Sequence, residues 1–267
     1  MEKIRCTAGI LTYNSAQTLR RVLESVKDFD DIILCDGGST DATLKIARAY
    51  GARVVAQDAQ FKDADGRLKN YAGVRNQLLD SAKNRWILFI DSDEAASPEL
   101  VREVARVVQE DSRCDGWRVP ERFVVAGRPI DYASNYPGYQ YRLLRTDRGV
   151  RFVKPVHEQP PHFAGLAPRC TLRGPWLVFW EQWDVDHYKE RNYKYLPLEV
   201  ARARGMSVAR FWLRFVPWHL RAIAVTLIKT ARDRLRHPLA AHMPLEVEWA
   251  RVRYQWALIC AVAREVL

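Results

Sequence analysis

Hydrophobic and polar positions alternate between two periods along the first half of the chain. Short apolar runs typical of strands cover residues 4–11, 32–35, 53–56 and 86–90. Between the first two runs, apolar residues recur at the helical spacing i, i+3, i+4, i+7: Leu19, Val22, Leu23 and Val26. Strands joined by helical crossovers predict a parallel sheet with helices on both faces. The expected fold class is therefore α/β.

Helix boundaries follow from capping residues. Ser15 and then Thr40 or Asp41 are suited to cap the first two helices, and Pro98 suits the first position of another. A longer helix is expected over residues 66–82.

The pattern changes after Gly116. Residues 117–130 and 139–152 each resemble a hairpin, and we expect antiparallel strands added to the first sheet. From about residue 188 the sequence is helical to its end. We therefore expect a catalytic domain over residues 1–200 and a basic amphipathic helical extension over residues 201–267.

Composition favours an intracellular protein with a sizeable core. A chain of 267 residues with 48% hydrophobic content can bury a sizeable core. Its five cysteines are an odd number without a Cys-x-x-Cys pair, which argues against a disulfide framework or structural zinc site. The N-terminus enters a strand at once, leaving no room for a signal peptide, and no uninterrupted apolar run reaches membrane-spanning length. We expect a cytoplasmic protein without a membrane span.

The net charge of +10 is unevenly placed. From Ala201 onward, twelve Lys and Arg face four Asp and Glu, so the first 200 residues are nearly neutral. Such a basic segment suits nucleic acid, an anionic membrane surface or a solvated face. Zinc-finger spacing and aromatic RNA-binding motifs are absent from the sequence, so we expect no nucleic-acid partner.

Polar clusters follow three of the predicted strands: Thr12-Tyr13-Asn14, Asp36, and Asp91-Ser92-Asp93. Ligands of open α/β sheets bind beyond the carboxyl ends of the strands. Aspartates at such places also serve as turn formers and helix caps. Here the acidic pair directly follows an apolar strand and Glu94 adds a third acid, which favours a hard divalent cation that grips a diphosphate.

Four ordered motifs resemble those of the family-2 glycosyltransferases with a GT-A fold: Thr12-Tyr13-Asn14, the Asp-Gly-Gly-Ser-Thr-Asp block at 36–41, Arg75-Asn76, and Asp91-Ser-Asp93-Glu94. The bacterial lipopolysaccharide-core β-glycosyltransferases share that block and a later Val-His-Glu. The resemblance implies a Rossmann-like mixed sheet with an α-helical C-terminal extension. It also implies an inverting hexosyltransferase that uses Mg²⁺ or Mn²⁺ and a nucleotide-diphosphate sugar, with a UDP-sugar favoured.

The resemblance also implies roles for individual residues. Thr12, Asp36 and Arg75 would hold the nucleotide, with Tyr13 beside the base and Asn14 in the same motif. Asp91 would reach the ribose and the metal, and Asp93 would ligate the metal directly.

The catalytic carboxylate that the family requires is expected at Glu158, within Val156-His157-Glu158. Inverting transfer needs a general base that takes the acceptor's proton as its oxygen attacks. A histidine downstream of the base often completes the metal site in such enzymes. His187 is the candidate, and His157 is the alternative.

A helix expected from Pro217 to Leu235 carries an apolar face with Trp218 and Ile228, and Arg214, Arg221 and Arg232 lie along the opposite edge. One interpretation packs it on the catalytic domain or in a homodimer. The other lays it in the plane of an anionic membrane surface. The second interpretation would suit a lipid-linked or lipopolysaccharide-type glycan acceptor.

Three other classes of protein share some of these features. A haloacid-dehalogenase-like phosphatase would use Asp91 as nucleophile and Asp93 as acid/base, but needs a second acidic pair after a later strand, which the sequence lacks. A nucleotidyltransferase would carry a Gly-rich basic loop where Thr12–Ser15 stands. A non-catalytic peripheral membrane protein would explain the basic extension but not the four motifs.

Overall fold

The computed structural model describes residues 2–110, 114–153, 170–180, 193 and 196–267. The chain divides into two compact units. The first contains residues 1–122 and 137–178, and the second contains residues 123–136 and 179–267. The functional boundary expected after residue 200 stays a prediction.

The first unit is built on four parallel strands: β1 (Ile4–Thr12), β2 (Phe29–Asp36), β3 (Arg53–Ala56) and β4 (Trp86–Asp91). β1 lies between β2 and β4, and β3 pairs with β2. The helices between and after these strands are α1 (Leu19–Ser25), α2 (Thr43–Ala49), α3 (Tyr71–Ser81) and α4 (Pro98–Gln109), with a 3₁₀ turn η1 (Ala59–Phe61). The predicted parallel α/β core is therefore confirmed.

Antiparallel strands extend this sheet: β5 (Glu94–Ala96), β6 (Gly116–Val125), β8 (Tyr139–Arg145) and β10 (Trp176–Trp180). The order along the sheet is β3-β2-β1-β4-β8-β6-β10-β5. β8 is antiparallel to both β4 and β6, and the short β9 (Cys170–Thr171) adds to β6. The expected antiparallel addition is therefore confirmed, and the sheet is mixed.

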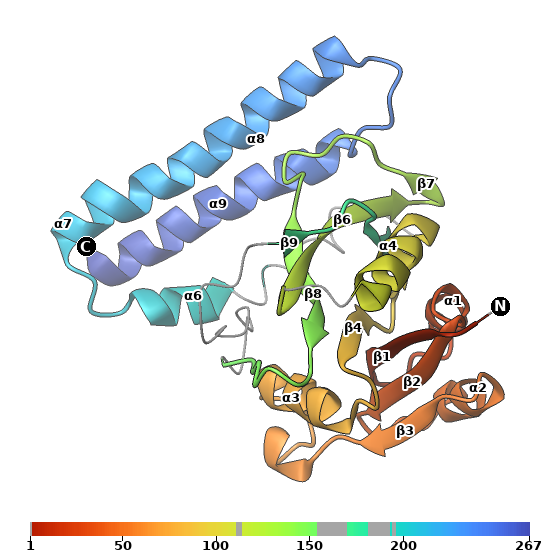
Figure 1. Cartoon of the computed structure of the whole chain (residues 1–267). Coiled ribbons are helices and arrows are strands. Elements are labelled where there is room, and N and C mark those ends of the chain that lie inside the picture. Colours follow the sequence, from red (N-terminus) through yellow and green to blue (C-terminus); the bar gives the residue numbers. More distant parts are fainter. Residues whose placement is uncertain (1, 111–113, 154–169, 181–192, 194–195) are drawn as a thin grey trace. The chain divides into compact units, whose positions relative to one another are not determined.

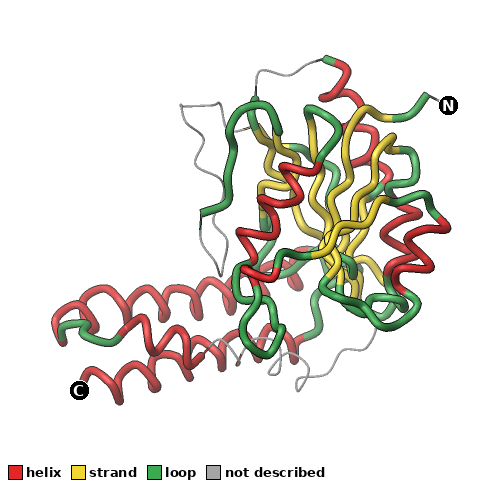
Figure 2. The backbone as a smooth tube through the Cα atoms, turned by 90° about the horizontal axis from the view of Figure 1, so that it is seen from below, coloured by secondary structure: helices red, strands yellow, loops and turns green. Residues whose placement is uncertain are grey.

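Alternating side chains of the strands form two hydrophobic cores. Ile10, Leu34 and Leu88 pack in one cluster with apolar residues of α1 and α4. Ile33 is the neighbour of Leu34 on β2, and Phe89 is the neighbour of Leu88 on β4. These two side chains pack in the other cluster with residues of α3. Because successive strand residues point to opposite faces, helices cover both sides of the sheet, as Figures 1 and 2 show.

The predicted hairpin over residues 139–152 is wrong in its second arm. β8 forms, but residues 150–153 form no strand. The Asn76 side chain takes the place of a partner strand, because its Oδ1 accepts from the Phe152 N–H at 2.9 Å and its Nδ2 donates to the Phe152 carbonyl at 3.0 Å.

Cys114 and Cys170 are paired as a disulfide, with their Cα atoms 6.3 Å apart. The sequence argued against a disulfide framework, and this one pair departs from that expectation. They stand 56 residues apart, and the pairing of β9 with β6 brings their segments together.

The second unit is mainly helical: α6 (Leu196–Ala203), α7 (Val208–Arg210), a π-helical turn η2 (Phe211–Phe215), α8 (Val216–Arg236) and α9 (Leu245–Val266). It also holds β7 (Arg128–Pro129), which pairs with the end of β6. α8 and α9 run side by side as an antiparallel hairpin in both views. Phe211, Leu258, Ile259 and Val262 form its core near the free end of α9.

The helical stretch Val208–Arg236 is 29 residues long, and by length and composition it could cross a membrane. Only 11% of its most apolar window is buried. Arg214 and Arg221 interrupt the apolar residues of this stretch. For that reason it does not appear as an uninterrupted apolar run in the sequence.

Candidate active site

Three of the predicted site residues lie at one edge of the sheet. Thr12 is in register with Asp36 on β2, and its neighbour Leu11 is in register with Asp91 on β4. The Gly37 N–H donates to the Thr12 carbonyl at 2.8 Å, which joins the ends of β1 and β2. The carboxyl ends of adjacent parallel strands thus place Thr12, Asp36 and Asp91 together, as the sequence predicts.

The loop after β2 fixes the Asp36 carboxylate. Its Oδ2 accepts from the N–H groups of Gly38 and Ser39 at 2.9 and 2.8 Å, and its Oδ1 accepts from Ser39 Oγ at 2.5 Å. Gly38 has φ +99°, a conformation that favours glycine. These bonds fix the buried Asp36 carboxylate at the end of β2.

Tyr13 and Asn14 form a second loop against the first. The Tyr13 ring is 65% exposed, and a Cβ at position 37 would lie 3.1 Å from it, so glycine there allows the contact. Asn14 has φ +46°, its N–H donates to Ser39 Oγ at 2.9 Å, and its Oδ1 accepts from the Thr40 N–H at 2.8 Å. Asn14 therefore joins the two loops, and Tyr13 presents a flat exposed ring above them.

Arg75 reaches the same edge from α3. Its Nη2 lies 3.2 Å from Asp91 Oδ1, and its guanidinium lies 5.7 Å from the centre of the Phe89 ring. The structure thus brings together Arg75 and Asp91, which the resemblance assigned to the site separately and not as a pair. Asn76, the second residue of that motif, anchors the backbone at Phe152 instead.

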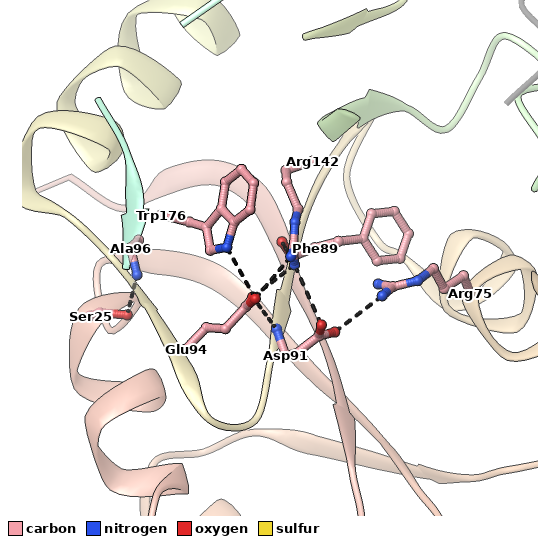
Figure 3. A network of polar contacts seen from close by, with 8 residues as sticks. All are labelled: Ser25, Arg75, Phe89, Asp91, Glu94, Ala96, Arg142 and Trp176. Atoms are coloured by element: carbon pink, nitrogen blue, oxygen red, sulfur yellow. Dashed lines mark hydrogen bonds and ion pairs between the residues drawn. The ribbon is translucent and has the colours of Figure 1, made fainter. Parts of the chain in front are cut away.

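Next to Asp91 lies a buried polar network centred on Glu94 (Figure 3). Its carboxylate accepts two hydrogen bonds from the Arg142 guanidinium, at 2.8 and 2.9 Å. It also accepts from Trp176 Nε1 at 3.0 Å and from the Asp91 backbone N–H at 3.0 Å. Glu94 therefore fixes the backbone of the acidic segment through the Asp91 N–H.

The charged groups of this network also influence Asp91. Burial raises the pKa of Glu94 to about 7, and the nearby Arg142 guanidinium opposes that rise. Arg142 Nη1 also lies 3.8 Å from Asp91 Oδ2. Asp91 thus lies between two arginines, Arg75 and Arg142, which suits a position where further negative charge gathers.

Sequence reasoning missed Arg142, Trp176 and Lys62. Lys62 Nζ donates to the Gly37 carbonyl at 2.7 Å and so supports the loop after β2. A lone arginine in the apolar run Tyr141–Leu144 was a weak signal of a buried partner. The identity of that partner depends on strand register.

Asp91 and Asp93 supply the carboxylate oxygens that are expected from the sequence to hold a divalent cation at this edge. Asp91 is half-buried and Asp93 is exposed. Within the described part of the chain, no group of three or more His, Cys, Asp or Glu side chains converges as a metal site. Mg²⁺ in particular binds through one or two carboxylates completed by phosphates and water. Glu158, His157 and His187 lie outside the described residues.

The family model of glycosyl transferase family 2 matches residues 7–167. A glycosyltransferase of Bacillus subtilis, the SPbeta prophage-derived SunS, is 31% identical over 167 residues, covering 61% of this chain and 36% of that protein. An uncharacterized glycosyltransferase of Rickettsia bellii is 37% identical over 158 residues, covering 58% of this chain and 44% of its own length. The chain thus spans less than half the length of these relatives.

Among solved structures, Staphylococcus aureus TarS 1–349 in complex with UDP-GlcNAc is similar, with a TM-score of 0.49 and 16% identity over 97% of this chain and 90% of that one. The matched family region contains Thr12, Asp36, Arg75 and the Asp91–Glu94 segment, whereas Trp176 lies beyond its end. That segment is therefore part of a glycosyltransferase domain and not a phosphatase motif. Because the family model matches more than half of its length, the chain belongs to glycosyl transferase family 2, and its structure is a mixed α/β sheet with C-terminal helices.

Proposed function

We propose that this glycosyltransferase is inverting and depends on a divalent metal, and that it moves a hexose from a UDP-sugar to an acceptor hydroxyl. The observation that carries the proposal is the placement of Asp36 and Asp91 at the ends of the two strands that flank β1, with Arg75 bound to Asp91. Two fixed carboxylates and a cation at one sheet edge match the needs of a nucleotide diphosphate with its metal.

The nucleotide would lie over the two loops that Asn14 joins. Thr12 and Asp36 would hold it, and the exposed Tyr13 ring offers a flat face for the base. The Thr12 Oγ1 atom is buried and has no hydrogen-bond partner among the described residues, which supports a site whose polar groups are not all matched within the protein.

The metal would be Mg²⁺ or Mn²⁺, held by Asp91 and Asp93. When bound, it would neutralise the charge that develops on the diphosphate as the sugar leaves. The chain's own part is positioning: Glu94 fixes the Asp91 backbone, and Arg75 and Arg142 balance the Asp91 charge. The role of His187 or His157 as a further ligand stays a prediction.

We propose Glu158 as the general base that activates the acceptor. It would take the proton of the acceptor hydroxyl while the oxygen attacks the anomeric carbon from the opposite side of the leaving group. We further propose a lipid-linked or lipopolysaccharide-type glycan as acceptor, and a cytoplasmic protein bound peripherally to the inner face of the membrane. The basic excess after Ala201 supports this placement. A homodimer is the alternative use of the same helices.

The test is to incubate the purified chain with UDP-glucose, UDP-galactose or UDP-N-acetylglucosamine, with Mn²⁺, with Mg²⁺ or with EDTA. We expect at least one donor to release UDP slowly by transfer to water, in the presence of metal and not with EDTA. Release of UDP in EDTA would contradict the metal dependence. A phosphatase would instead leave the UDP-sugars intact and release inorganic phosphate from a phosphomonoester such as p-nitrophenyl phosphate.

A further inference from the structure

One side of α8 is apolar and open to solvent. We call it the outer face, and it comprises exposed residues that recur at helical spacing and continue upstream into η2: Leu213, Leu220, Ala224, Leu227, Ile228, Ala231 and Leu235. Leu213, Ile228 and Leu235 expose 77%, 65% and 83% of their surface. Scattered exposed leucines are ordinary, but a continuous apolar strip of this length is typical of a surface that binds something.

The opposite side of α8 is already occupied. His219 Nδ1 lies 2.6 Å from Gln255 Oε1 on α9, and Val216 packs against the core formed by Phe211 and Leu258. The next residues on this side, including Ile223, Thr226 and Asp233, are half-buried or buried. The outer face of α8 is therefore turned away from α9, and Figures 1 and 2 show the two helices side by side.

A basic edge runs along the outer face. Arg214, Arg221 and Arg232 are all exposed, and they follow one another at spacings of seven and eleven residues, which places them on one side of the helix. Trp212 and Trp218 are exposed near the first two. The single acid between residues 208 and 236 is Asp233, which is buried and pairs with Arg232 at 2.6 Å. The outer face thus offers positive charge with no carboxylate of its own.

The surroundings of α8 argue against a membrane-spanning helix. α9 lies alongside it and carries Glu248, Arg251 and Arg253 within its length. The polar pair His219 and Gln255 lies between the two helices. A spanning hairpin would place these charges in hydrocarbon, which is costly for every unpaired one. An in-plane helix keeps them on the aqueous side and places only the outer face in the membrane.

A second copy of the chain fits the outer face less well. Two copies that meet through the same face would bring only cations to the contact, because the face has no acid to pair with Arg214 or Arg221. Anionic lipid headgroups supply the missing countercharge, and tryptophan beside arginine is suited to the headgroup layer.

We propose that the outer face of α8 is a docking surface for an anionic membrane, with the helix lying in the plane of the bilayer. The apolar strip enters the boundary between headgroups and acyl chains, and the basic edge binds the phosphates. This inference concerns binding alone, so it is tested separately from the transfer reaction.

The test is co-sedimentation of the purified full chain with vesicles of phosphatidylcholine, with or without about one third phosphatidylglycerol. The wild type is expected to pellet with the anionic vesicles, to pellet weakly with the neutral ones, and to be released by high salt. The variant Arg214→Glu with Arg221→Glu should bind at least about tenfold more weakly, because each reversal replaces an attraction by a repulsion. The control Lys45→Glu with Arg48→Glu changes net charge equally on exposed positions of α2 and should bind as the wild type does.

A second variant, Leu213→Ser with Ile228→Ser and Leu235→Ser, removes apolar area from exposed positions and should also lose binding while remaining folded by circular dichroism. Equal binding by the basic-edge variant and its control would overturn the proposal. So would wild-type protein that ignores anionic vesicles, or that resists extraction by salt and alkaline carbonate. A dimer by light scattering that the triple serine variant abolishes, without vesicle binding by the wild type, would assign the face to a second copy.

Discussion

Arg142 on β8 and Glu94 on β5 form a buried ion pair with two hydrogen bonds, and the Glu94 carboxylate also accepts from the Asp91 backbone N–H. The pair is buried on both sides, so neither charge can turn to water. It links a strand of the antiparallel extension to the acidic segment that follows β4. The extension thereby positions a site built mainly by the parallel strands.

Removing one partner of this pair should be costly. Arg142→Met leaves the Glu94 carboxylate buried without its cation, and we expect the free energy of unfolding to fall by about 3–5 kcal/mol in urea titrations. The double variant Arg142→Met with Glu94→Leu removes both charges and should recover much of that loss, because a buried pair contributes little net stability. Its UDP affinity should remain weakened, since the Asp91 N–H has lost its acceptor. Full recovery of affinity would contradict the positioning role of Glu94.

Ser39 is expected to matter for donor binding through Asp36. Ser39→Ala removes the hydroxyl that donates to Asp36 Oδ1 and accepts from the Asn14 N–H, so the two loops loosen. We predict UDP affinity about tenfold weaker by calorimetry, with a thermal midpoint close to that of the wild type. Ser25→Ala, which removes a hydroxyl bonded to the Ala96 N–H away from these loops, is the matched control. Equal affinities in the two variants would show that the loop contact is irrelevant to the nucleotide.

Asp93→Ala tests the metal. The carboxylate of Asp93 is exposed and contributes little to stability, so the fold of the variant should remain intact. UDP binding should lose its dependence on Mn²⁺, and transfer should be abolished. If the variant still gains UDP affinity on addition of Mn²⁺ as the wild type does, Asp93 is not a ligand.

Glu158→Gln keeps the shape of the side chain and removes its basicity. Turnover should fall by roughly 10²–10⁴, with donor affinity nearly unchanged. The measurement is transfer rate at saturating donor, with UDP affinity measured in parallel. Turnover within a few-fold of the wild type would mean that another carboxylate is the base.

Asp147 should make stability depend on pH. Hydrogen bonds from Arg145 and Arg85 hold the pKa of Asp147 well below its usual range. A lowered pKa contributes stability that is fully present above the unfolded pKa of about 3.9 and is lost as pH falls toward the folded value. Asp147→Asn should cost about 1 kcal/mol near pH 7, since solvent screens this partly exposed pair, and progressively less below about pH 4. A difference between variant and wild type that stays constant from pH 7 to about pH 3 would contradict this origin.

Local pattern was enough to predict much of the parallel half of the fold. The strand over residues 53–56 and the Pro98 helix start match the structure, because apolar periodicity and capping chemistry are local signals. The meeting of Thr12, Asp36 and Asp91 was also predictable, since parallel strands end at a common edge.

The remaining features depend on contacts between distant segments. Trp176 and Glu94 are 82 residues apart, and only the antiparallel pairing of β10 with β5 brings them together. The failed second arm of the hairpin after β8 has the same origin, because Asn76 on α3 satisfies the Phe152 backbone in place of a strand. Asn14 was assigned to the nucleotide by resemblance, whereas its contacts show that it joins two loops.

If the loops after β1, β2 and β4 form one metal-dependent nucleotide site, the metal should protect all three loops at once. Hydrogen–deuterium exchange of the full chain, with UDP and Mn²⁺ against UDP alone, measures that protection. We expect slower exchange, with the metal present, in peptides covering residues 12–14, 36–41 and 91–94 together, and unchanged exchange in α9. Protection that is absent from these three segments, or that is the same without Mn²⁺, would contradict it.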